Sequence, residues 1–189
     1  SNDASATSVG TIDSTGQVNT TAGFSIISYT GNTTAGATVA HGLSSAPEAI
    51  ILKARDNARD WRVYHSSLGA TKTLDLNTTG AEQGPNAAYW NNTAPTSSVF
   101  SVGNVTTVNG AEAYIAYCFH SVDGYSKFGS YVGNGNADGP FIYTGFRPAW
   151  ILTKKSSATG NWILQDTVRD SFNPSEDRIY ANESDAEID

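Results

Sequence analysis

The sequence has very little cysteine and few strong helix formers. Cys118 is the one cysteine among 189 residues, and Leu, Lys and Glu together number only 18. A single cysteine cannot close an internal disulfide, so the chain is not a small secreted module held together by disulfides. The shortage of helix formers argues against a helical bundle and against an α/β enzyme with repeated crossover helices.

Basic residues and long apolar runs are also scarce. Eleven Lys and Arg stand against 18 Asp and Glu, which gives a net charge of −7 and a pI near 4.8. Such a chain offers no basic surface for nucleic acid or anionic lipid. No apolar run approaches the roughly 20 residues that a membrane helix needs. We therefore expect no nucleic-acid partner and no membrane insertion.

Turn residues and strand-forming residues are abundant instead. Gly, Ser, Thr and Asn make up 75 of the 189 residues. Apolar runs alternate with turn clusters at intervals of about 8–12 residues, which predicts an all-β domain of short strands. The predicted strands are Phe24–Thr30, Ala35–His41, Ala49–Arg55, Trp61–His65, Lys72–Leu76, Val99–Val102 and Glu112–His120. The last has apolar residues at both alternating sets of positions, which predicts a central strand covered on both faces.

The sequence also repeats itself, at an offset of 101 to 106 residues. The matched segments occur in the same order in both copies, which predicts a tandem duplication of a unit of about 100 residues, the size of a small β-sandwich. The matches are Gly23–Ser25 with Gly124–Ser126, Ser28–Asn32 with Ser130–Asn134, Ile50–Lys53 with Ile151–Lys154, Trp61 with Trp162, and Asn77–Glu82 with Asn182–Glu187.

This repeat predicts three parts: a polar arm or linker over residues 1–22, a first β-sandwich module over 23–122, and a truncated second module over 123–189. We expect the second module to open with strands at Ser126–Val132 and Trp150–Lys154. It has no counterpart of the long strand near residue 115, so its apolar side chains need another cover. A partner chain or a continuing chain is favoured over fusion of the two modules into one sandwich.

Comparison of the two copies separates structural from functional candidates. Trp61 and Trp162 occupy the same place in each copy, so we expect both in a hydrophobic core. Positions that differ are better functional candidates, and here Trp150 aligns with Ala49 while Asp166 aligns with His65.

The sequence shows no motif for catalysis. It contains no Gly-x-Ser-x-Gly, His-Glu-x-x-His or phosphate-loop pattern. Cys118 and His120 would share one face of a strand, but a small buried core residue is the better interpretation of Cys118. We therefore expect no catalytic residues and no enzyme activity.

One segment has the composition of a sugar-binding site. Tyr89, Trp90, Asn91 and Asn92 combine aromatic rings with amides, the groups that hold sugars by stacking and hydrogen bonding. The structural alternative is a tryptophan packed at the end of a strand.

A second segment has the spacing of a calcium loop. Asn134, Asn136 and Asp138 place oxygen ligands at alternate positions before a glycine. Only Asp138 is charged, and Gly145 stands where such a loop carries a bidentate Glu, so a plain hairpin loop is the favoured interpretation. Calcium is the one cofactor for which the sequence offers a candidate site.

The longest motif lies in the second copy and reads GYSKFGSYVGNGN over residues 124–136, then DGPFIYTGFRPAW over 138–150. It resembles a repeat of structural proteins of tailed phages, particularly marine ones, and Trp61–Gly69 and Tyr114–Phe119 are similar to the same family. The resemblance covers about residues 20–189. It implies a virion component, often in or near tail fibres, with lectin-like β-sandwich modules and no catalytic residues.

Together these patterns predict an antiparallel β-sandwich, of jelly-roll or lectin-like type, duplicated with an incomplete second copy. The expected function is that of a non-enzymatic phage virion or tail-fibre-associated structural protein, located in the extracellular particle. Its expected partners are other virion subunits, in a homo-oligomer, and a host-surface glycan. The alternatives are a carbohydrate-binding module of a secreted bacterial protein and, third, a glycan-cleaving enzyme.

Overall fold

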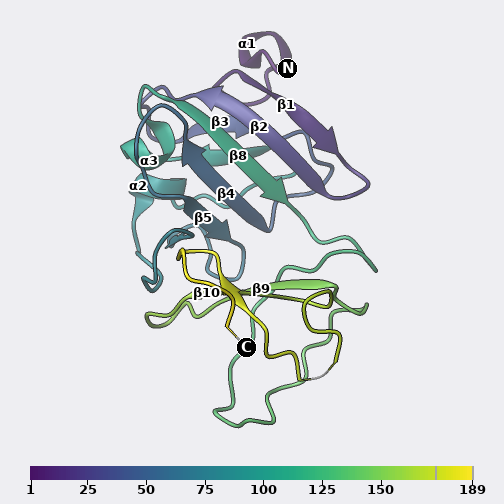
Figure 1. Ribbon diagram of the computed structural model, residues 1–189. Coiled ribbons are helices and arrows are strands. Elements are labelled where there is room, and N and C mark those ends of the chain that lie inside the picture. The colour runs from purple at the N-terminus through teal and green to yellow at the C-terminus, as the bar shows by residue number, and fades with distance from the viewer. Residues whose placement is uncertain (173, 189) are drawn as a thin grey trace.

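Antiparallel sheets dominate the computed structural model, which describes residues 1–172 and 174–188. Within these residues a six-stranded sheet has the order β1-β2-β8-β4-β5-β6, and a two-stranded sheet, β3-β7, lies behind it (Figure 1). A third sheet, β11-β10-β9, lies below this sandwich in the same view. The predicted all-β class with antiparallel sandwich packing is confirmed.

The strand bounds are β1 Ser14–Asn19, β2 Phe24–Thr30, β3 Ala37–Ala40, β4 Ala49–Ala54, β5 Arg62–His65, β6 Leu74–Asp75, β7 Val99–Val102, β8 Ala113–Phe119, β9 Trp150–Lys154, β10 Trp162–Asp166 and β11 Ile179–Tyr180. The helices have one turn each and are α1 Ala4–Thr7, α2 Ala87–Trp90 and α3 Thr106–Asn109. Every strand predicted for the first module forms, although most are shorter than predicted. Among the described residues, no helix is long and apolar enough to cross a membrane.

Strand β8 lies in the middle of the six-stranded sheet. It pairs with β2 on one edge and with β4 on the other, and its side chains alternate between buried and half-buried. Tyr114, Ala116 and Cys118 point into the core between the two sheets and are fully buried. On the opposite face Phe119 stacks on Phe24 at 4.8 Å between ring centroids. The predicted central position of this strand is confirmed.

Two tyrosines tie the sheet to the α3 segment. Tyr29 and Tyr114 stack with ring centroids 5.1 Å apart, and both are buried. The hydroxyl of Tyr29 donates to the carbonyl of Val108, and that of Tyr114 donates to the carbonyl of Thr106, each at 2.5 Å. Each buried hydroxyl therefore has a partner, which offsets the cost of removing it from water.

The N-terminal residues are not the arm or linker that the composition predicted. Residues 14–19 form β1, which pairs along its whole length with β2, and Ile12 is buried in the core beside Val39. The prediction was wrong because it relied on polar composition. Only Ser14 of β1 is buried, so this polar edge strand is held mainly by its backbone hydrogen bonds to β2.

The C-terminal sheet repeats the pairing of β4 and β5 in the same register. Ala49 pairs with His65 in the first hairpin, and the residues 101 positions later, Trp150 and Asp166, pair in the second. The order continues alike, with β6 beside β5 and β11 beside β10. This agreement is what duplication predicts. Duplication itself and the jelly-roll topology stay predictions.

One side-chain bond is repeated as well. The Asn77 side-chain oxygen accepts the backbone N–H of Trp61 at 2.9 Å, and the Asn182 side-chain oxygen accepts that of Trp162 at 2.7 Å. In the first unit the bond joins the start of β5 to the loop after β6. In the second unit it joins the start of β10 to the loop after β11. The repeated sequence therefore encodes a repeated local structure.

The predicted opening strand of the second module, Ser126–Val132, does not form, and this prediction was wrong. Residues 129–143 are exposed and carry no strand. The matching strand β2 lies between β1 and β8. Among the described residues, no strand pairs with the Ser126–Val132 segment. Alternating apolar residues do not hold a strand without a neighbour to satisfy its backbone groups.

The C-terminal sheet packs on the outer face of the six-stranded sheet through Trp162. This side chain is 7% exposed and contacts Val63 and Leu74, with Leu152 against the same cluster. Its indole N–H donates to the carbonyl of Asp75 at 2.9 Å. Trp162 is thus buried as predicted, but in the contact between the two units.

Trp61 differs from its counterpart. It is only half-buried, and the Lys53 ammonium lies 6.0 Å from its ring centroid. The expectation that both tryptophans lie in a core was wrong for Trp61.

Replacing Trp162 with alanine is expected to release the C-terminal sheet from the sandwich. The change removes a buried indole and its hydrogen bond, and truncating a buried Trp costs about 3–5 kcal/mol. Limited proteolysis should cut residues 121–188 earlier in Trp162→Ala than in the parent, with a lower melting temperature. The matched control is Trp61→Ala, which should lose less stability. Equal losses in the two variants would contradict this assignment.

His41 makes stability depend on pH. Its ring is fully buried, Nδ1 accepts the N–H of Leu43 at 3.1 Å, and Nε2 lies 3.0 Å from the carbonyl of Thr96. Nδ1 is therefore an acceptor in a neutral ring that carries its proton on Nε2. Burial lowers the pKa of His41 below its ordinary value.

Because the folded pKa of His41 is depressed, the stability it contributes is present above the unfolded value near 6.5 and is lost as pH falls below it. The free energy of unfolding of the parent should decrease more steeply between pH 7.5 and 5.5 than that of His41→Gln. Denaturant titrations at each pH measure this. Some slope will persist in the variant, since burial also lowers the pKa of His65. Parallel curves for the two proteins would contradict the prediction.

Candidate interaction surface

The predicted sugar-binding segment lies on and after α2, and its tryptophan is in the core. Trp90 is 1% exposed and packs edge-on against Tyr64, with ring centroids 5.7 Å apart. Asn91 ends α2 in the left-handed conformation, and Asn92, also left-handed, is exposed. Stacking on a sugar needs an open ring face. The structure gives Trp90 no such face. It packs in the core, as a structural tryptophan does, but from the end of α2, whereas the structural alternative placed it at the end of a strand.

Tyr89 belongs to a buried polar network around Arg62. The Arg62 guanidinium lies 4.6 Å from the centroid of the Tyr89 ring, and the Tyr89 hydroxyl donates to Gln83 at 3.1 Å. Arg62 also donates to the Asp75 carboxylate at 2.6 Å, and Gln83 donates to its other oxygen at 2.5 Å. Burial raises the pKa of Asp75, and the nearby Arg62 charge opposes that shift. These groups satisfy one another, so the network stabilises the fold and leaves no open binding position.

The predicted calcium ligands Asn134, Asn136 and Asp138 are all exposed. The side-chain oxygen of Asn134 accepts the N–H of residue 136 at 3.0 Å, and that of Asn136 accepts the N–H of residue 138 at 3.1 Å. Each oxygen thus closes a local turn two residues on. Throughout residues 1–172 and 174–188, no three His, Cys, Asp or Glu side chains are grouped to hold a metal ion.

Cys118 is fully buried and unpaired, as the core interpretation predicted. Burial raises the pKa of its thiol to about 12. The thiolate is the reactive form of cysteine, so this residue is inert at neutral pH. The nearby His120 makes a different contact. Its Nδ1 lies 2.8 Å from the carbonyl of Ser121.

Exposed apolar side chains gather in the C-terminal part of the chain. Among the described residues, ten of the eleven exposed large hydrophobic side chains lie between positions 125 and 172. They are Tyr125, Tyr131, Val132, Phe141, Ile142, Tyr143, Trp150, Ile151, Val168 and Phe172, and we call this set the C-terminal apolar residues. The remaining one, Val18, lies on β1. The sandwich buries its own large side chains, so this asymmetry belongs to residues 121–188 alone.

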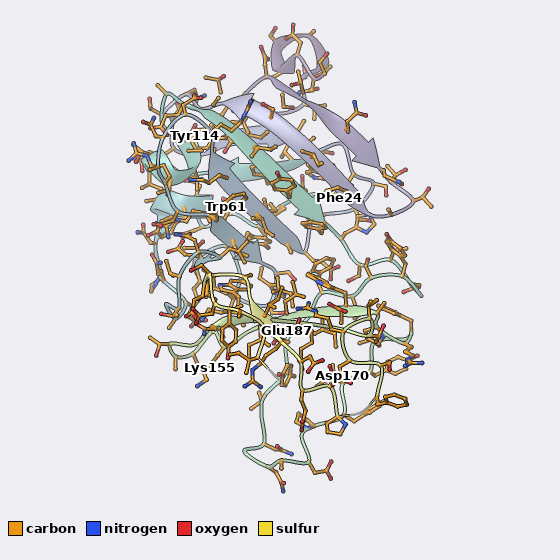
Figure 2. The ribbon with its side chains drawn as sticks, in the orientation of Figure 1. Phe24, Trp61, Tyr114, Lys155, Asp170 and Glu187 are labelled. Carbon is orange, nitrogen blue, oxygen red and sulfur yellow. The ribbon has the colours of Figure 1, made fainter. Side chains whose placement is uncertain are left out.

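The C-terminal apolar residues come from loops as well as strands. In Figure 1 the chain leaves β8, runs down away from the sandwich and loops at the bottom before it reaches β9. The same region of Figure 2 lies around the labelled Lys155, Asp170 and Glu187. Nothing in this part covers Phe141 or Tyr143, which are 90% and 78% exposed. Such side chains stay in water at a cost unless another molecule covers them.

The two positions that distinguish the repeats are neighbours in this region. Trp150 and Asp166 are cross-strand partners at the end of the β9–β10 hairpin. Trp150 is 54% exposed, whereas its counterpart Ala49 is buried. The Asp166 carboxylate accepts two backbone N–H groups and the guanidinium of Arg169, and these bonds lower its pKa. The pair therefore presents an open indole beside a carboxylate whose charge is balanced by Arg169.

The comparison of copies singled out Trp150, but no sequence signal marked Phe141, Tyr143 or Phe172. Aromatic residues in strand-like runs are usually buried. Their exposure fits the expectation that the second module lacks a cover for its apolar side chains, although the sequence did not indicate which residues would be left uncovered.

The family model described as domain of unknown function (DUF7483) matches residues 1–189. No curated protein and no solved structure matches the chain. The function must therefore be inferred from the geometry of the chain itself.

Cys118 is expected to resist thiol reagents in the folded protein, since the thiolate fraction is negligible and the side chain is enclosed. Reaction with a disulfide reagent at pH 7.5 should be at least about a hundredfold slower in buffer than in denaturant, because burial raises the pKa of the thiol to about 12. Stopped-flow absorbance measures both rates. A fast stoichiometric reaction of the native chain would show that β8 opens readily.

Proposed function

The chain belongs to the DUF7483 family, a domain family of unknown function, and we propose that it is a non-enzymatic structural subunit of a phage particle. In this proposal it lies in or near the tail fibres and contacts neighbouring subunits through residues 121–189. The sandwich of β1 to β8 serves as the rigid scaffold. The same exposed surface is available for a host-surface glycan.

The observation that carries the proposal is the concentration of exposed apolar side chains in one part of the chain. A monomeric protein rarely exposes many large apolar residues in one region, and where they occur they mark contacts with other molecules. Here Tyr125, Phe141 and Trp150 all lie within about 25 residues of sequence and all are more than half exposed. Aromatic side chains of this kind supply most of the energy at the centre of protein interfaces.

The sequence resemblance supports the same assignment independently. The motif similar to phage structural repeats covers residues 124–150, and six of the C-terminal apolar residues lie in that motif before Trp150. The motif is therefore exposed in the folded chain. An exposed, aromatic-rich motif is better suited to contacts between subunits than to a core.

The alternative of a carbohydrate-binding module has less support at the segment predicted to bind sugar, residues 89–92. Its main stacking residue, Trp90, is buried. Any sugar contact would instead use the exposed rings of Tyr131, Tyr143 or Trp150. Binding to a host glycan is thus a second property of the same surface and needs no separate site.

The proposal is tested by locating the chain in phage particles. Particles are purified by density-gradient centrifugation from a culture in which the gene is expressed during infection. Quantitative mass spectrometry should find peptides of this chain in the particle band at a fixed ratio to capsid protein. Recovery only in the unassembled fraction would overturn the assignment.

A double variant then tests whether the C-terminal apolar residues make the contacts between subunits. Particles made with Phe141→Ser and Tyr143→Ser together should incorporate the chain at least about tenfold less, the effect of losing roughly 1.4 kcal/mol of contact energy. Both residues are exposed, so folding should be unaffected. The control is Val18→Ser, an exposed apolar residue of the scaffold that should leave incorporation unchanged.

A further inference from the structure

We propose that residues 125–131 and β9 lie on either side of an unfilled strand position, the gap, and that this position receives one extended segment of a neighbouring subunit. The proposal rests on the proposed function and specifies how the subunits join. The incoming segment adds to β9 by backbone pairing, as a β-strand does when it extends the edge of an existing sheet.

The first border is the free edge of β9. Strand β9 corresponds to β4, which lies between β5 and β8, whereas β9 pairs with β10 alone among the described residues. Ile50 in β4 is fully buried, and its counterpart Ile151 is 44% exposed. Ile50 lies in the core against the β3–β7 sheet, whereas the described residues place no facing sheet over Ile151 and no second strand beside β9. An exposed apolar edge of this kind is a ready template for another strand.

The second border is the segment that corresponds to β2. Gly23 precedes β2 with φ +63°, and Gly124 precedes residues 125–131 with φ +72°, so both segments start from the same left-handed turn. Tyr29 of β2 is 3% exposed, and its counterpart Tyr131 is 55% exposed. The local turn is therefore retained. Ser126 then bonds back to Val122 and Phe128 packs against Phe119 of β8, whereas residues 129–131 are exposed.

In the first unit one strand fills the position between these two borders. Strand β8 pairs with β2 through Phe24–Phe119 and Tyr29–Tyr114, and with β4 through Ile50–Cys118. Both aromatic pairs stack, at 4.8 and 5.1 Å. The segments that correspond to β2 and β4 are both present in the second unit. The strand that joins β2 to β4 in the first unit, β8, has no counterpart among the described residues of the second. A single strand would thus pair the open edge of β9 and cover Tyr125 and Tyr131.

The register of β8 defines the chemistry of the incoming segment. It must run antiparallel to β9 and carry aromatic residues at the positions of Tyr114 and Phe119, which stack on the β2 counterparts. It must carry small residues at the positions of Ala116 and Cys118, which are fully buried where the sheet faces its core. The predicted ligand is therefore an extended segment of about seven residues, with an aromatic residue near each end and small residues at its two central inward-facing positions.

This segment does not come from the β8 of another copy. In every molecule of this protein β8 is already paired on both edges, and three of its side chains are fully buried. Releasing it would open one sandwich in order to complete another. A strand from a different polypeptide of the assembly carries no such penalty.

The probe is a synthetic peptide with the sequence of residues 112–120, with Cys118→Ser to prevent oxidation. On the full 189-residue chain it should slow backbone hydrogen exchange in residues 125–131 and 150–154, measured by mass spectrometry. A fluorescein-labelled peptide should give saturable anisotropy. The control peptide carries Ala116→Pro, which removes a backbone donor and cannot pair along its length. Equal binding of the two peptides, or no change in exchange, would overturn the proposal.

Variants of the chain test the borders separately. Tyr131→Ser and Ile151→Asp should each weaken peptide binding at least tenfold without lowering the melting temperature, since both side chains are exposed. Val18→Ser is the matched control and should bind as the parent does. Unchanged affinity in both border variants would overturn the proposal. So would light scattering that shows a dimer of the chain abolished by Ile151→Asp, because a second copy would then occupy the gap.

The two proposals fail in different ways. If the chain is found in particles but the peptide does not bind, the structural role stands and the gap is not a strand site. If the peptide binds at both borders but the chain is absent from particles, the strand site stands and its partner belongs to another assembly.

Discussion

Pairing of β8 on both of its edges is the interaction on which the rest of the structure depends. Its backbone joins β2 to β4, two strands that are otherwise separate, and its buried face carries Tyr114, Ala116 and Cys118 into the core. The stack of Tyr29 on Tyr114 then fixes α3 through two short hydrogen bonds. Without this strand, neither of its neighbours would have a complete set of backbone partners.

The second unit shows what happens to the same sequence pattern when that strand is missing. The β9–β10 hairpin keeps the register of β4–β5, because a hairpin is stabilised by contacts between adjacent segments. The β2 counterpart does not become a strand: the segment that precedes it, β8, already pairs with β2 and β4, and the described residues supply no other strand beside it. Trp162 compensates in part by anchoring the hairpin to the first unit. The apolar residues left uncovered form the surface to which we assign the function.

The sequence predicted the fold more accurately than it predicted the site. Alternation and turn chemistry located the strands of the sandwich and the central position of β8. The same reasoning placed Trp90 beside amides that bind sugars, yet Trp90 packs against Tyr64, a residue distant in sequence. It also treated residues 1–22 as a linker, because edge strands have no distinctive apolar pattern. The exposed Phe141 and Tyr143 were not foreseen, since their exposure depends on which neighbours are present.

By itself the sequence determined the all-β class, most strand positions, the inert buried cysteine and the repeated hairpin, because each follows from local alternation, turn residues and short-range pairing. Only the tertiary structure decided which strands acquired partners, that Trp162 is buried between units while Trp61 is half-buried, and that the apolar residues of positions 125–172 face solvent. The physical reason is that burial and sheet pairing are properties of two segments at once. A residue's own neighbours in sequence fix its preference for a strand, and the segment that arrives beside it decides whether that preference is satisfied.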